Sequence, residues 1–343
     1  MSAWFETGRC YIIAEIGVNH DGDVAVAREM IDVAADAGAD AVKFQTFSAD
    51  RLVTADARKA SYQDQNDPRA GESQHAMLQR LELSEDELIA CREHCLKRDI
   101  EFLSTPFDED SADLLMDVGV KGFKVSSGDL TNIPLLEHLA RKGLPIIVST
   151  GMGDMDEVRE AVEAIRAAGN PPLALLHCVS NYPAAPEDCN LSAIDTLARA
   201  FEIPVGWSDH TLGDTIALAA IARGASILEK HYTLDTNRAG PDHKASLMPE
   251  ELKALITGIR TVEAAIGDGI KQPKPSEMDT AKVARRSLVA ARDIKPGEAI
   301  TAEMITRKRP GTGLKPNAID QVLGRKAKNA IAIDTLIGLE DLA

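Results

Sequence analysis

Eight short apolar runs recur along the first three-quarters of the chain, and a segment with helical periodicity follows each of them. The runs cover residues 11–17, 40–46, 100–105, 122–127, 145–150, 173–179, 203–207 and 226–230. They are rich in branched side chains without strict alternation, as is typical of parallel strands buried on both faces. Eight strand–helix alternations over roughly 260 residues predict a (β/α)8 TIM barrel.

A doubly wound open sheet is the alternative fold for alternating strands and helices. That fold normally carries a glycine-rich nucleotide-binding turn after its first strand. The corresponding segment here, Gly17-Val18-Asn19-His20-Asp21-Gly22, does not match such a turn. The barrel is therefore the favoured interpretation.

The pattern changes near the C-terminus. We expect a barrel domain over residues 1–268, a linker over 269–284 that contains QPKPS, and a small β-rich domain over 285–343. In the last domain, residues 287–291 and 294–298 are predicted to form short strands and a turn, and residues 307–313 a basic, glycine-rich loop. A domain of this size is marginally stable alone, so we expect it to pack on a barrel, its own or a partner's.

The long polar segment 48–79 interrupts the barrel pattern after the second run. Its many Asp, Gln and Arg residues predict a loop rather than a helix. Loops of this length in compact domains are usually lids or binding loops.

Two histidines, His210 and His231, follow the last two apolar runs, with one helix-length segment between them. Neighbouring parallel strands lie about 4.8 Å apart, so both imidazoles could reach one metal ion. The alternative is a pair of ordinary hydrogen-bonded histidines at strand ends. Two ligands are too few to identify the metal.

The active site of a (β/α)8 barrel lies at the C-terminal ends of its strands. The polar residues expected there are Glu15, Lys43, Gln45, Ser104, Thr105, Lys124, Ser126, Ser127, Asp129, Ser180, Tyr182, Ser208, His210 and His231.

Two of these residues, Lys43 and Lys124, stand inside apolar runs. A buried lysine is costly unless it meets an anion. With the hydroxyls of Thr105, Ser127 and Ser208, the two lysines form a plausible cradle for a phosphate and a carboxylate. Pairing with a barrel glutamate such as Glu15 is one alternative, and a Schiff-base lysine is another.

Composition limits the partners and the compartment. A net charge of −16 argues against a nucleic-acid or anionic-membrane surface. The five cysteines form no CxxC pair and are odd in number, which favours reduced thiols. No signal-peptide pattern is present, and no apolar run approaches the ~18 residues that a membrane span needs. We expect a soluble cytoplasmic protein.

The strand ends also resemble a known family. IAEIGVNHDGD, AVKFQTF, FLSTPFD, FKVSSGDLTNIPLL, VSTGM, LLHCVSNYP, GWSDHT, LEKHYT and GPDHKAS resemble, in order and spacing, the sialic acid synthase (N-acetylneuraminate synthase) family. RRSLVAARDIKPGEAIT and KRPGTG resemble its C-terminal antifreeze-protein-like (SAF) domain. The resemblance extends from about Ile12 to Gly313.

The resemblance implies an activity. Members of this family condense phosphoenolpyruvate with an N-acetylated amino sugar, such as one of the N-acetylmannosamine type, to give a nonulosonic acid and phosphate by C–O cleavage. They use a divalent metal, typically Mn²⁺, with Mg²⁺ or Co²⁺ as possible substitutes. Legionaminate, pseudaminate and spore-coat sugars are other products within the family, and KVSSGDLTN favours a legionaminate-type or spore-coat-type product over neuraminate.

The resemblance also implies roles for individual residues. His210 and His231 match the metal ligands. The positions that match phosphoenolpyruvate contacts are Lys43, Thr105, Lys124, Ser127, Ser180 and Ser208. Gln45, Tyr182 and Asp242 match sugar contacts.

Five further positions bear on the predicted site. Asp129 stands where many members have a catalytic Glu, and Glu15 is a candidate to stabilise positive charge that develops on the substrate. Arg309 matches an arginine that enters the neighbouring subunit's site in a domain-swapped homodimer. Arg285 and Arg286 stand where some members place an aromatic residue.

Two rival functions remain open. A pyruvate aldolase of the Schiff-base type would use one of the two lysines as its nucleophile. A non-enzymatic carbohydrate-binding role would leave both histidines and both lysines without a reaction to perform.

Overall fold

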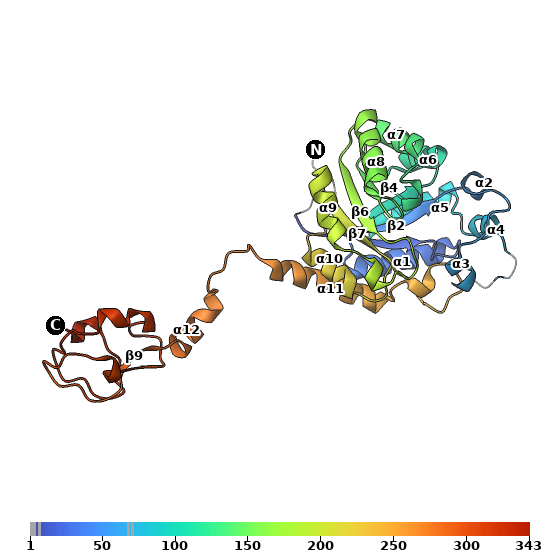
Figure 1. The fold of residues 1–343 in the computed structure, drawn as a ribbon. Coiled ribbons are helices and arrows are strands. Elements are labelled where there is room, and N and C mark those ends of the chain that lie inside the picture. Colours follow the sequence, from blue (N-terminus) through green and yellow to red (C-terminus); the bar gives the residue numbers. More distant parts are fainter. Residues whose placement is uncertain (1–4, 6–7, 67–68, 70–71) are drawn as a thin grey trace. The chain divides into compact units, whose positions relative to one another are not determined.

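The computed structural model describes residue 5, residues 8–66, residue 69 and residues 72–343, and it divides into two compact units, Met1–Gly267 and Asp268–Ala343 (Figure 1). The first unit contains one sheet of eight parallel strands in the order β3-β2-β1-β8-β7-β6-β5-β4. The strands are β1 (Tyr11–Gly17), β2 (Ala41–Thr46), β3 (Glu101–Pro106), β4 (Phe123–Val125), β5 (Ile146–Ser149), β6 (Leu173–Cys178), β7 (Val205–Asp209) and β8 (Ile227–His231).

Two features close this sheet into a barrel. The first and last strands, β1 and β8, are hydrogen-bonded neighbours, with Glu15 in register with His231. The end strands of the order, β3 and β4, also lie against each other. The predicted (β/α)8 barrel is therefore confirmed.

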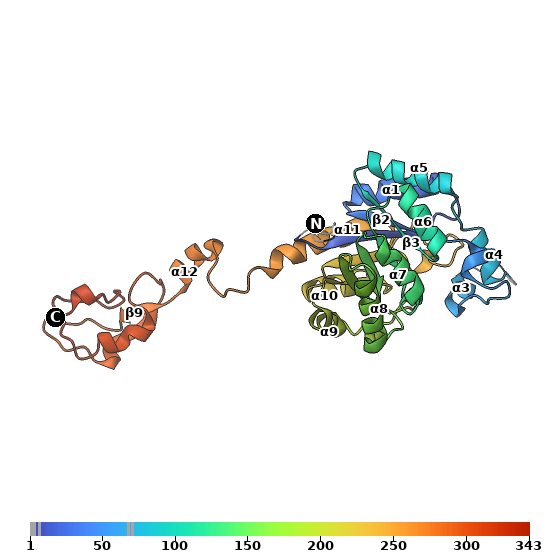
Figure 2. The ribbon, with the colours of Figure 1, turned by 90° about the horizontal axis from the view of Figure 1, so that it is seen from above.

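The helices surround the sheet (Figure 2). They are α1 (Val24–Ala37), α5 (Glu85–Lys97), α6 (Glu109–Val118), α7 (Ile133–Arg141), α8 (Met155–Ala168), α9 (Ser192–Phe201), α10 (Thr215–Ala222) and α11 (Pro249–Ile266). Their ends follow local capping rules. The Asp23 side chain caps α1, Gly38 ends it with a φ of 88°, and Ser84 with Glu87 forms a capping box at the start of α5.

Alternate residues of each strand face two different cores. On β1, Ile12 and Ala14 pack with the helices in a large outer core, whereas Ile13 packs in a small cluster inside the barrel. The inner cluster holds Phe5, Tyr11, Ile13, Ala41, Leu103, Ile147, Ala174, Leu176 and Ile227. Continuing along the inner face, two residues further, β1 carries Glu15 and β2 carries Lys43. The interior thus changes from apolar to charged toward the C-terminal strand ends.

The segment 48–79 is not the loop that its composition predicts. It contains three short helices, α2 (Ala49–Leu52), α3 (Ser61–Asn66) and α4 (Gln74–Gln79). Apolar residues from both of its ends pack together with residues of the first two strand ends, in a cluster of Val18, Phe47, Ala49, Met77, Leu78 and Leu81. The two groups of side chains are far apart in the sequence, so helical periodicity could not predict that they pack together.

The second unit has its own apolar core, formed by Leu288, Ala290, Ile294, Ile300, Met304, Val322, Ala327, Ile331, Ile337 and Leu342. Its two strands, β9 (Ser287–Ala290) and β10 (Ile305–Lys308), are antiparallel. Of the short strands and the turn predicted at 287–291 and 294–298, the first strand is β9 and the turn lies at Pro296-Gly297, whereas Ile294 forms only an isolated bridge to Ile331. The stretch expected to be a linker carries α12 (Met278–Ala284), and the predicted loop 307–313 begins inside β10.

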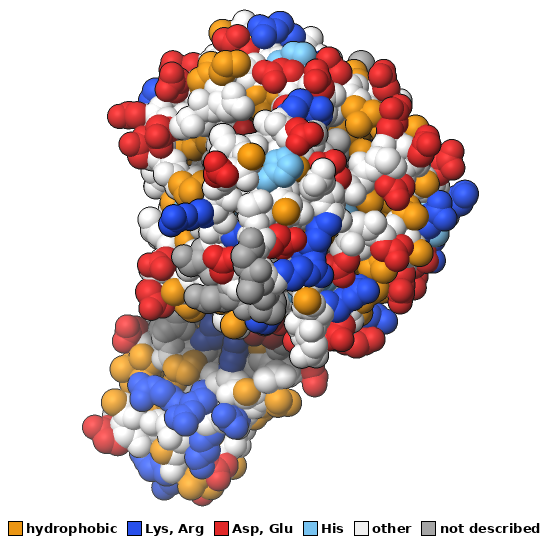
Figure 3. Space-filling view, turned by 90° about the vertical axis from the view of Figure 1, so that its right-hand side faces the viewer, with side chains coloured by type: hydrophobic (Ala, Val, Ile, Leu, Met, Phe, Trp, Pro, Cys, Tyr) orange, Lys and Arg blue, Asp and Glu red, His pale blue; other side chains and the backbone are white. Residues whose placement is uncertain are grey.

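Acidic side chains are spread over the face of the first unit that is seen in Figure 3, in keeping with the negative net charge. All five cysteines are free and buried. Within the part of the chain that the structure describes, no helix combines the length and hydropathy required to cross a membrane.

Candidate active site

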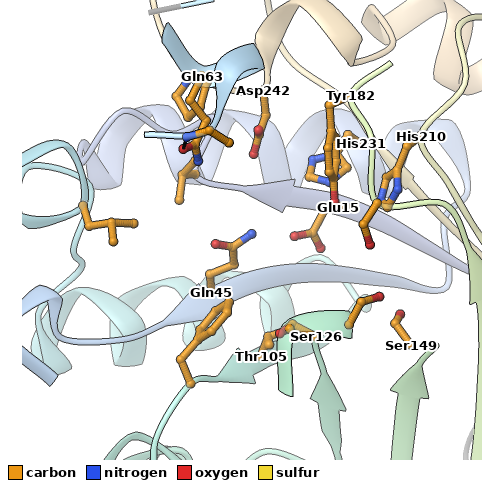
Figure 4. A pocket seen from close by; sticks show the side chains of 18 of the residues that line it. Glu15, Gln45, Gln63, Thr105, Ser126, Ser149, Tyr182, His210, His231 and Asp242 are labelled. Carbon is orange, nitrogen blue, oxygen red and sulfur yellow. Dashed lines mark hydrogen bonds between the residues drawn. The ribbon is translucent and has the colours of Figure 1, made fainter. Parts of the chain in front are cut away.

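A cavity of about 480 Å³ opens at the C-terminal ends of the barrel strands (Figure 4). Thirteen of the predicted site residues line this cavity: Glu15, Lys43, Gln45, Thr105, Lys124, Ser126, Ser127, Ser180, Tyr182, Ser208, His210, His231 and Asp242. They come from seven of the eight strands or from the segments that follow them, so the barrel collects residues that are up to 227 positions apart in the sequence.

The structure does not place three predicted residues in the cavity wall. Ser104 is buried, and its Oγ lies 2.7 Å from Thr46 Oγ1. Asp129 lies on a short 3-10 turn after β4, where its carboxylate accepts hydrogen bonds from Ser126 Oγ at 2.8 Å and from Asn132 Nδ2 at 3.1 Å. Arg309 follows β10 in the second unit, as Arg285 and Arg286 precede β9. The roles of these residues stay predictions.

Two buried lysines and two buried carboxylates form the floor of the cavity. Lys43 Nζ lies 2.7 Å from Glu15 Oε2 and donates a hydrogen bond to Thr105 Oγ1 at 3.0 Å. Lys124 Nζ lies 3.5 Å from Glu229 Oε1, and Lys43 Nζ lies 3.9 Å from the other oxygen of Glu229. The predicted alternative, in which a lysine pairs with Glu15, is therefore confirmed for Lys43. The pair still lines an open cavity.

Glu229 is the main site residue that sequence reasoning missed. Its side chain is buried, lines the cavity and accepts a hydrogen bond from Ser208 Oγ at 2.9 Å. The sequence could have indicated Glu229, because it is a charged residue inside an apolar run. The same feature identified Lys43 and Lys124 as candidates. Its second oxygen has no hydrogen-bond partner among the described residues.

The charges of the floor influence one another. Burial raises the pKa of Glu15 to about 7, although Lys43 opposes this shift. Burial also favours a higher pKa for Glu229, but the positive charges of Lys124 and Lys43 have the larger effect and lower the pKa of Glu229 to about 2. Burial lowers the pKa of Lys124, whereas Glu15 and Glu229 overcome burial at Lys43 and raise its pKa.

The two histidines face each other across one side of the cavity (Figure 4). Their ring centroids are 5.8 Å apart, and the Tyr182 ring lies 4.1 Å from that of His210 and 5.7 Å from that of His231. His210 Nδ1 lies 2.7 Å from the carbonyl oxygen of Val179, an arrangement in which Nδ1 carries the proton. His231 Nδ1 is buried and has no hydrogen-bond partner among the described residues.

These two imidazoles fit a metal site in part. Burial lowers the pKa of both histidines, and neutral imidazole is the form that binds metals. The bond from Nδ1 to a backbone carbonyl fixes the His210 tautomer and leaves Nε2 with its lone pair, as is usual for a ligating histidine. Among the described residues, no group of three or more His, Cys, Asp or Glu side chains forms a complete cluster of ligands.

A glycine keeps the hydroxyl-lined end of the cavity open. Gly151 N donates to Ser127 Oγ at 3.0 Å, and a Cβ atom on Gly151 would lie 2.3 Å from Ser180 Oγ and 2.8 Å from both Ser127 Oγ and Cys178 Sγ. Such distances are far below van der Waals contact, so any side chain here would displace the serine hydroxyls.

We therefore expect Gly151→Ala to lower turnover at least about tenfold, because it moves two hydroxyls proposed to contact the substrate. Steady-state kinetics of the purified variant would measure this loss. The control is Gly258→Ala on α11, outside the cavity wall, where a Cβ atom would lie 3.1 Å from the end of the Leu218 side chain. A Gly151→Ala enzyme with the kinetics of Gly258→Ala would show that the opening is unimportant.

The helical segment after β2 builds the far wall of the cavity. Leu52, Val53, Gln63 and Met77 line it, and Figure 4 shows Gln63 beside Asp242. Asn66 Nδ2 donates to the carbonyl oxygen of Pro241 at 2.9 Å, which ties α3 to the segment that carries Asp242. The expected binding role of this segment agrees with its position on the wall, although its secondary structure does not agree with the predicted loop.

Comparisons with known proteins agree with this architecture. Residues 30–271 match the model of the NeuB family, and residues 285–343 match that of the SAF domain. The chain is 47% identical to the N,N'-diacetyllegionaminic acid synthase of Legionella pneumophila, over 96% of this chain and 93% of that protein. It is 37% identical to the N-acetylneuraminate-9-phosphate synthase of Mus musculus, over 96% of this chain and 91% of that protein.

A solved structure gives the same result. The N-acetylneuraminic acid synthetase of Leptospira borgpetersenii, crystallised with citrate, superposes with a TM-score of 0.70 at 39% identity, over 79% of this chain and 90% of that one. These relatives are named as synthases of nonulosonic acids, which supports an enzymatic function over a purely structural or carbohydrate-binding one. With its barrel matched by one family model and its second unit matched by the SAF model, this chain belongs to the NeuB family.

Proposed function

We propose that this protein condenses phosphoenolpyruvate with an N-acetylated amino sugar to give a nonulosonic acid and phosphate. The observation that carries the proposal is the cavity floor, where two buried lysines and several hydroxyl groups lie below two neutral imidazoles. This arrangement suits a small, highly charged anion on one side and an uncharged, polar partner on the other.

Lys43 and Lys124 are the proposed anion-binding groups. Both ammonium groups are already held by carboxylates, Lys43 by Glu15 and Lys124 by Glu229, so neither needs to reorganise when substrate arrives. Thr105, Ser127 and Ser208 supply hydroxyl donors in the same wall. Charge-assisted hydrogen bonds from these groups would orient the carboxylate and phosphate of phosphoenolpyruvate.

The proposed reaction forms one carbon–carbon bond and breaks one carbon–oxygen bond. Carbon 3 of phosphoenolpyruvate attacks the aldehyde carbon of the open-chain sugar, and the aldehyde oxygen gains a proton. Carbon 2 becomes electron-poor, and the nearby carboxylate of Glu15 stabilises it until water adds there. Phosphate then leaves with the bridging oxygen. His210 and His231 would hold a divalent metal such as Mn²⁺, which would supply Lewis acidity for this step.

Gln45, Tyr182 and Asp242 are the proposed sugar contacts. All three line the cavity, and Figure 4 shows Tyr182 beside the two histidines and Asp242 beside Gln63 of α3. The higher identity to the Legionella protein than to the mouse protein makes an N,N'-diacetylated sugar the first acceptor to test, ahead of N-acetylmannosamine.

The direct test is phosphate release from phosphoenolpyruvate with a panel of mono- and di-N-acetylated amino sugars in the presence of Mn²⁺, with the product mass measured. The expected product contains the carbons of both substrates and no phosphate from phosphoenolpyruvate. Absence of phosphate release with every sugar would contradict the proposal.

A Schiff-base aldolase is the second candidate, because burial lowers the pKa of Lys124 and a lowered pKa is one route to a nucleophilic lysine. Borohydride reduction in the presence of pyruvate would trap the aldolase as a covalent adduct on Lys124. The proposed synthase predicts an unchanged protein mass after the same treatment.

The second unit is proposed to complete the site of a partner subunit through Arg309. We expect Arg309→Ala to raise the KM for the sugar while Mn²⁺ affinity stays the same, because an arginine contributes only to substrate contacts. A mixture of Arg309→Ala and Lys124→Ala chains should recover part of the activity if the unit crosses between subunits. No recovery in verified mixed dimers would refute the exchange.

A further inference from the structure

A second buried ion pair lies directly behind the histidines. Asp209 is the last residue of β7, and Lys230 is the residue before the end of β8. Lys230 Nζ lies 2.8 Å from Asp209 Oδ2, and both side chains are almost completely buried, with exposures of 1% and 0%. Neither residue lines the cavity, whereas Ser208, His210, Glu229 and His231 all do. The pair therefore faces away from the substrate, as the alternation of a strand requires.

The pair occupies the last rung between the two strands that carry the histidines. The register of β7 with β8 runs from Trp207 opposite Leu228 to Asp209 opposite Lys230. His210 and His231 come next along each strand, beyond the end of this ladder. The backbone hydrogen bonds between β7 and β8 therefore do not fix the distance between His210 and His231.

Asp209 also shapes the backbone around His210. Its Oδ1 accepts hydrogen bonds from Thr211 N at 2.9 Å and from Thr211 Oγ1 at 2.8 Å, which closes a tight turn over His210. From the other strand, Lys230 Nζ donates to the carbonyl oxygen of Thr211 at 2.5 Å. Thus one lysine on β8 holds the residues on both sides of His210, and it is the chain neighbour of His231.

We propose that the Asp209–Lys230 pair is a positioning device that sets the separation and orientation of His210 and His231 for a shared metal ion. The inference rests on the metal site of the proposed function. The pair is neutral as a unit, so its effect on a bound cation is geometric rather than electrostatic. Apolar residues of similar size would pack at least as well and often give equal or greater stability, but they would not bond to Thr211.

The test compares Mn²⁺ binding by metal-free proteins, measured by the electron paramagnetic resonance signal of free Mn²⁺. Asp209→Asn/Lys230→Met removes the bond between the strands and both charges, while the asparagine oxygen can still accept from Thr211. We expect the Kd for Mn²⁺ to rise about 10- to 100-fold, as for other residues that orient metal ligands. We also expect the midpoint of thermal unfolding in EDTA to stay the same or rise.

A matched control removes an ion pair between the two helices that precede and follow β7. Asp195 on α9 and Arg223 after α10 are paired, and each has a side-chain exposure of 40%. Asp195→Asn/Arg223→Met makes the same change in charge and should leave the Kd within about twofold of wild type, because exposed pairs contribute little. Saturating Mn²⁺ should restore turnover to the Asp209→Asn/Lys230→Met enzyme, since both imidazoles remain.

A Kd within twofold of wild type in Asp209→Asn/Lys230→Met would overturn the inference and leave the proposed metal site intact. Absence of His210-dependent Mn²⁺ binding in the wild type would overturn both. If the double variant does not fold, Thr211→Val replaces it, because valine removes one hydrogen bond of the turn without changing charge. That variant should raise the Kd about threefold or more, and an unchanged Kd would again refute the inference.

Discussion

Replacing Lys43 by methionine is expected to reduce turnover on the order of 10²- to 10³-fold or more, as for the loss of a preorganised charged group. The ammonium group lies 2.7 Å from Glu15 and 3.9 Å from Glu229, and it is the proposed anchor of the phosphoenolpyruvate anion. The same change leaves a buried carboxylate without its partner. The free energy of unfolding should therefore fall by about 3–5 kcal/mol. Steady-state kinetics and urea unfolding measure the two effects separately.

Two further variants separate binding from stability. In Lys43→Met/Glu15→Gln the uncompensated carboxylate is gone, so most of the lost stability should return while turnover stays low. Lys59→Met removes another buried lysine, which lies 3.5 Å from Asp64 and 3.6 Å from Glu72 outside the cavity wall. It should reduce stability and leave the KM for phosphoenolpyruvate unchanged. A Lys43→Met enzyme with the wild-type KM and kcat would show that the anion binds elsewhere.

The barrel was predictable because its evidence is local. Each strand is a compact apolar run, and several helices carry side-chain caps, as at Asp23 and Ser84, so eight independent patterns point to one fold. In a barrel, the place of a residue along its strand determines at which end of the barrel it lies. A residue at the C-terminal end of any strand must lie near the same opening, which is why residues as distant as Glu15 and Asp242 could be expected in one cavity.

The interactions between site residues were less predictable, because they depend on register. Glu229 lies in a predicted strand, but only its alignment with Ser208 shows that it faces the lysines. The position of His210 likewise depends on where β7 ends, which the sequence does not fix to the residue. The observed strand ends at Asp209, two residues later than expected, and this brings His210 directly to the rim of the barrel.

Contacts between distant segments were not predictable at all. His210 owes its tautomer to the carbonyl oxygen of Val179, 31 residues earlier, and Asn66 bonds to Pro241 across 175 residues. The helices of segment 48–79 are similar, because Phe47 and Met77 become apolar neighbours only when the chain folds back on the barrel. A small apolar cluster of this kind cannot be predicted from the composition of a segment that is mostly polar.

Removal of one imidazole tests the metal directly. His210→Asn should bind Mn²⁺ at least about a hundredfold more weakly than wild type, with turnover reduced on the order of 10²- to 10³-fold, because a Lewis acid contributes several kcal/mol to such a reaction. Asparagine is chosen because its side-chain amide nitrogen can take the place of Nδ1 and donate to Val179 O, so the local fold should persist. Excess EDTA should inactivate the wild type, and added Mn²⁺ should restore only the wild type.

The matched control is His177→Gln. His177 is a partly buried histidine on β6 whose Nε2 lies 2.9 Å from the carbonyl oxygen of Cys189, and it does not line the cavity. The amide nitrogen of glutamine can replace Nε2 in that bond, so this variant should keep the Mn²⁺ affinity and the EDTA sensitivity of wild type. Two outcomes would contradict a metal site at the paired histidines. One is full wild-type activity in EDTA after extensive dialysis, and the other is an equal loss of Mn²⁺ affinity in His177→Gln and His210→Asn.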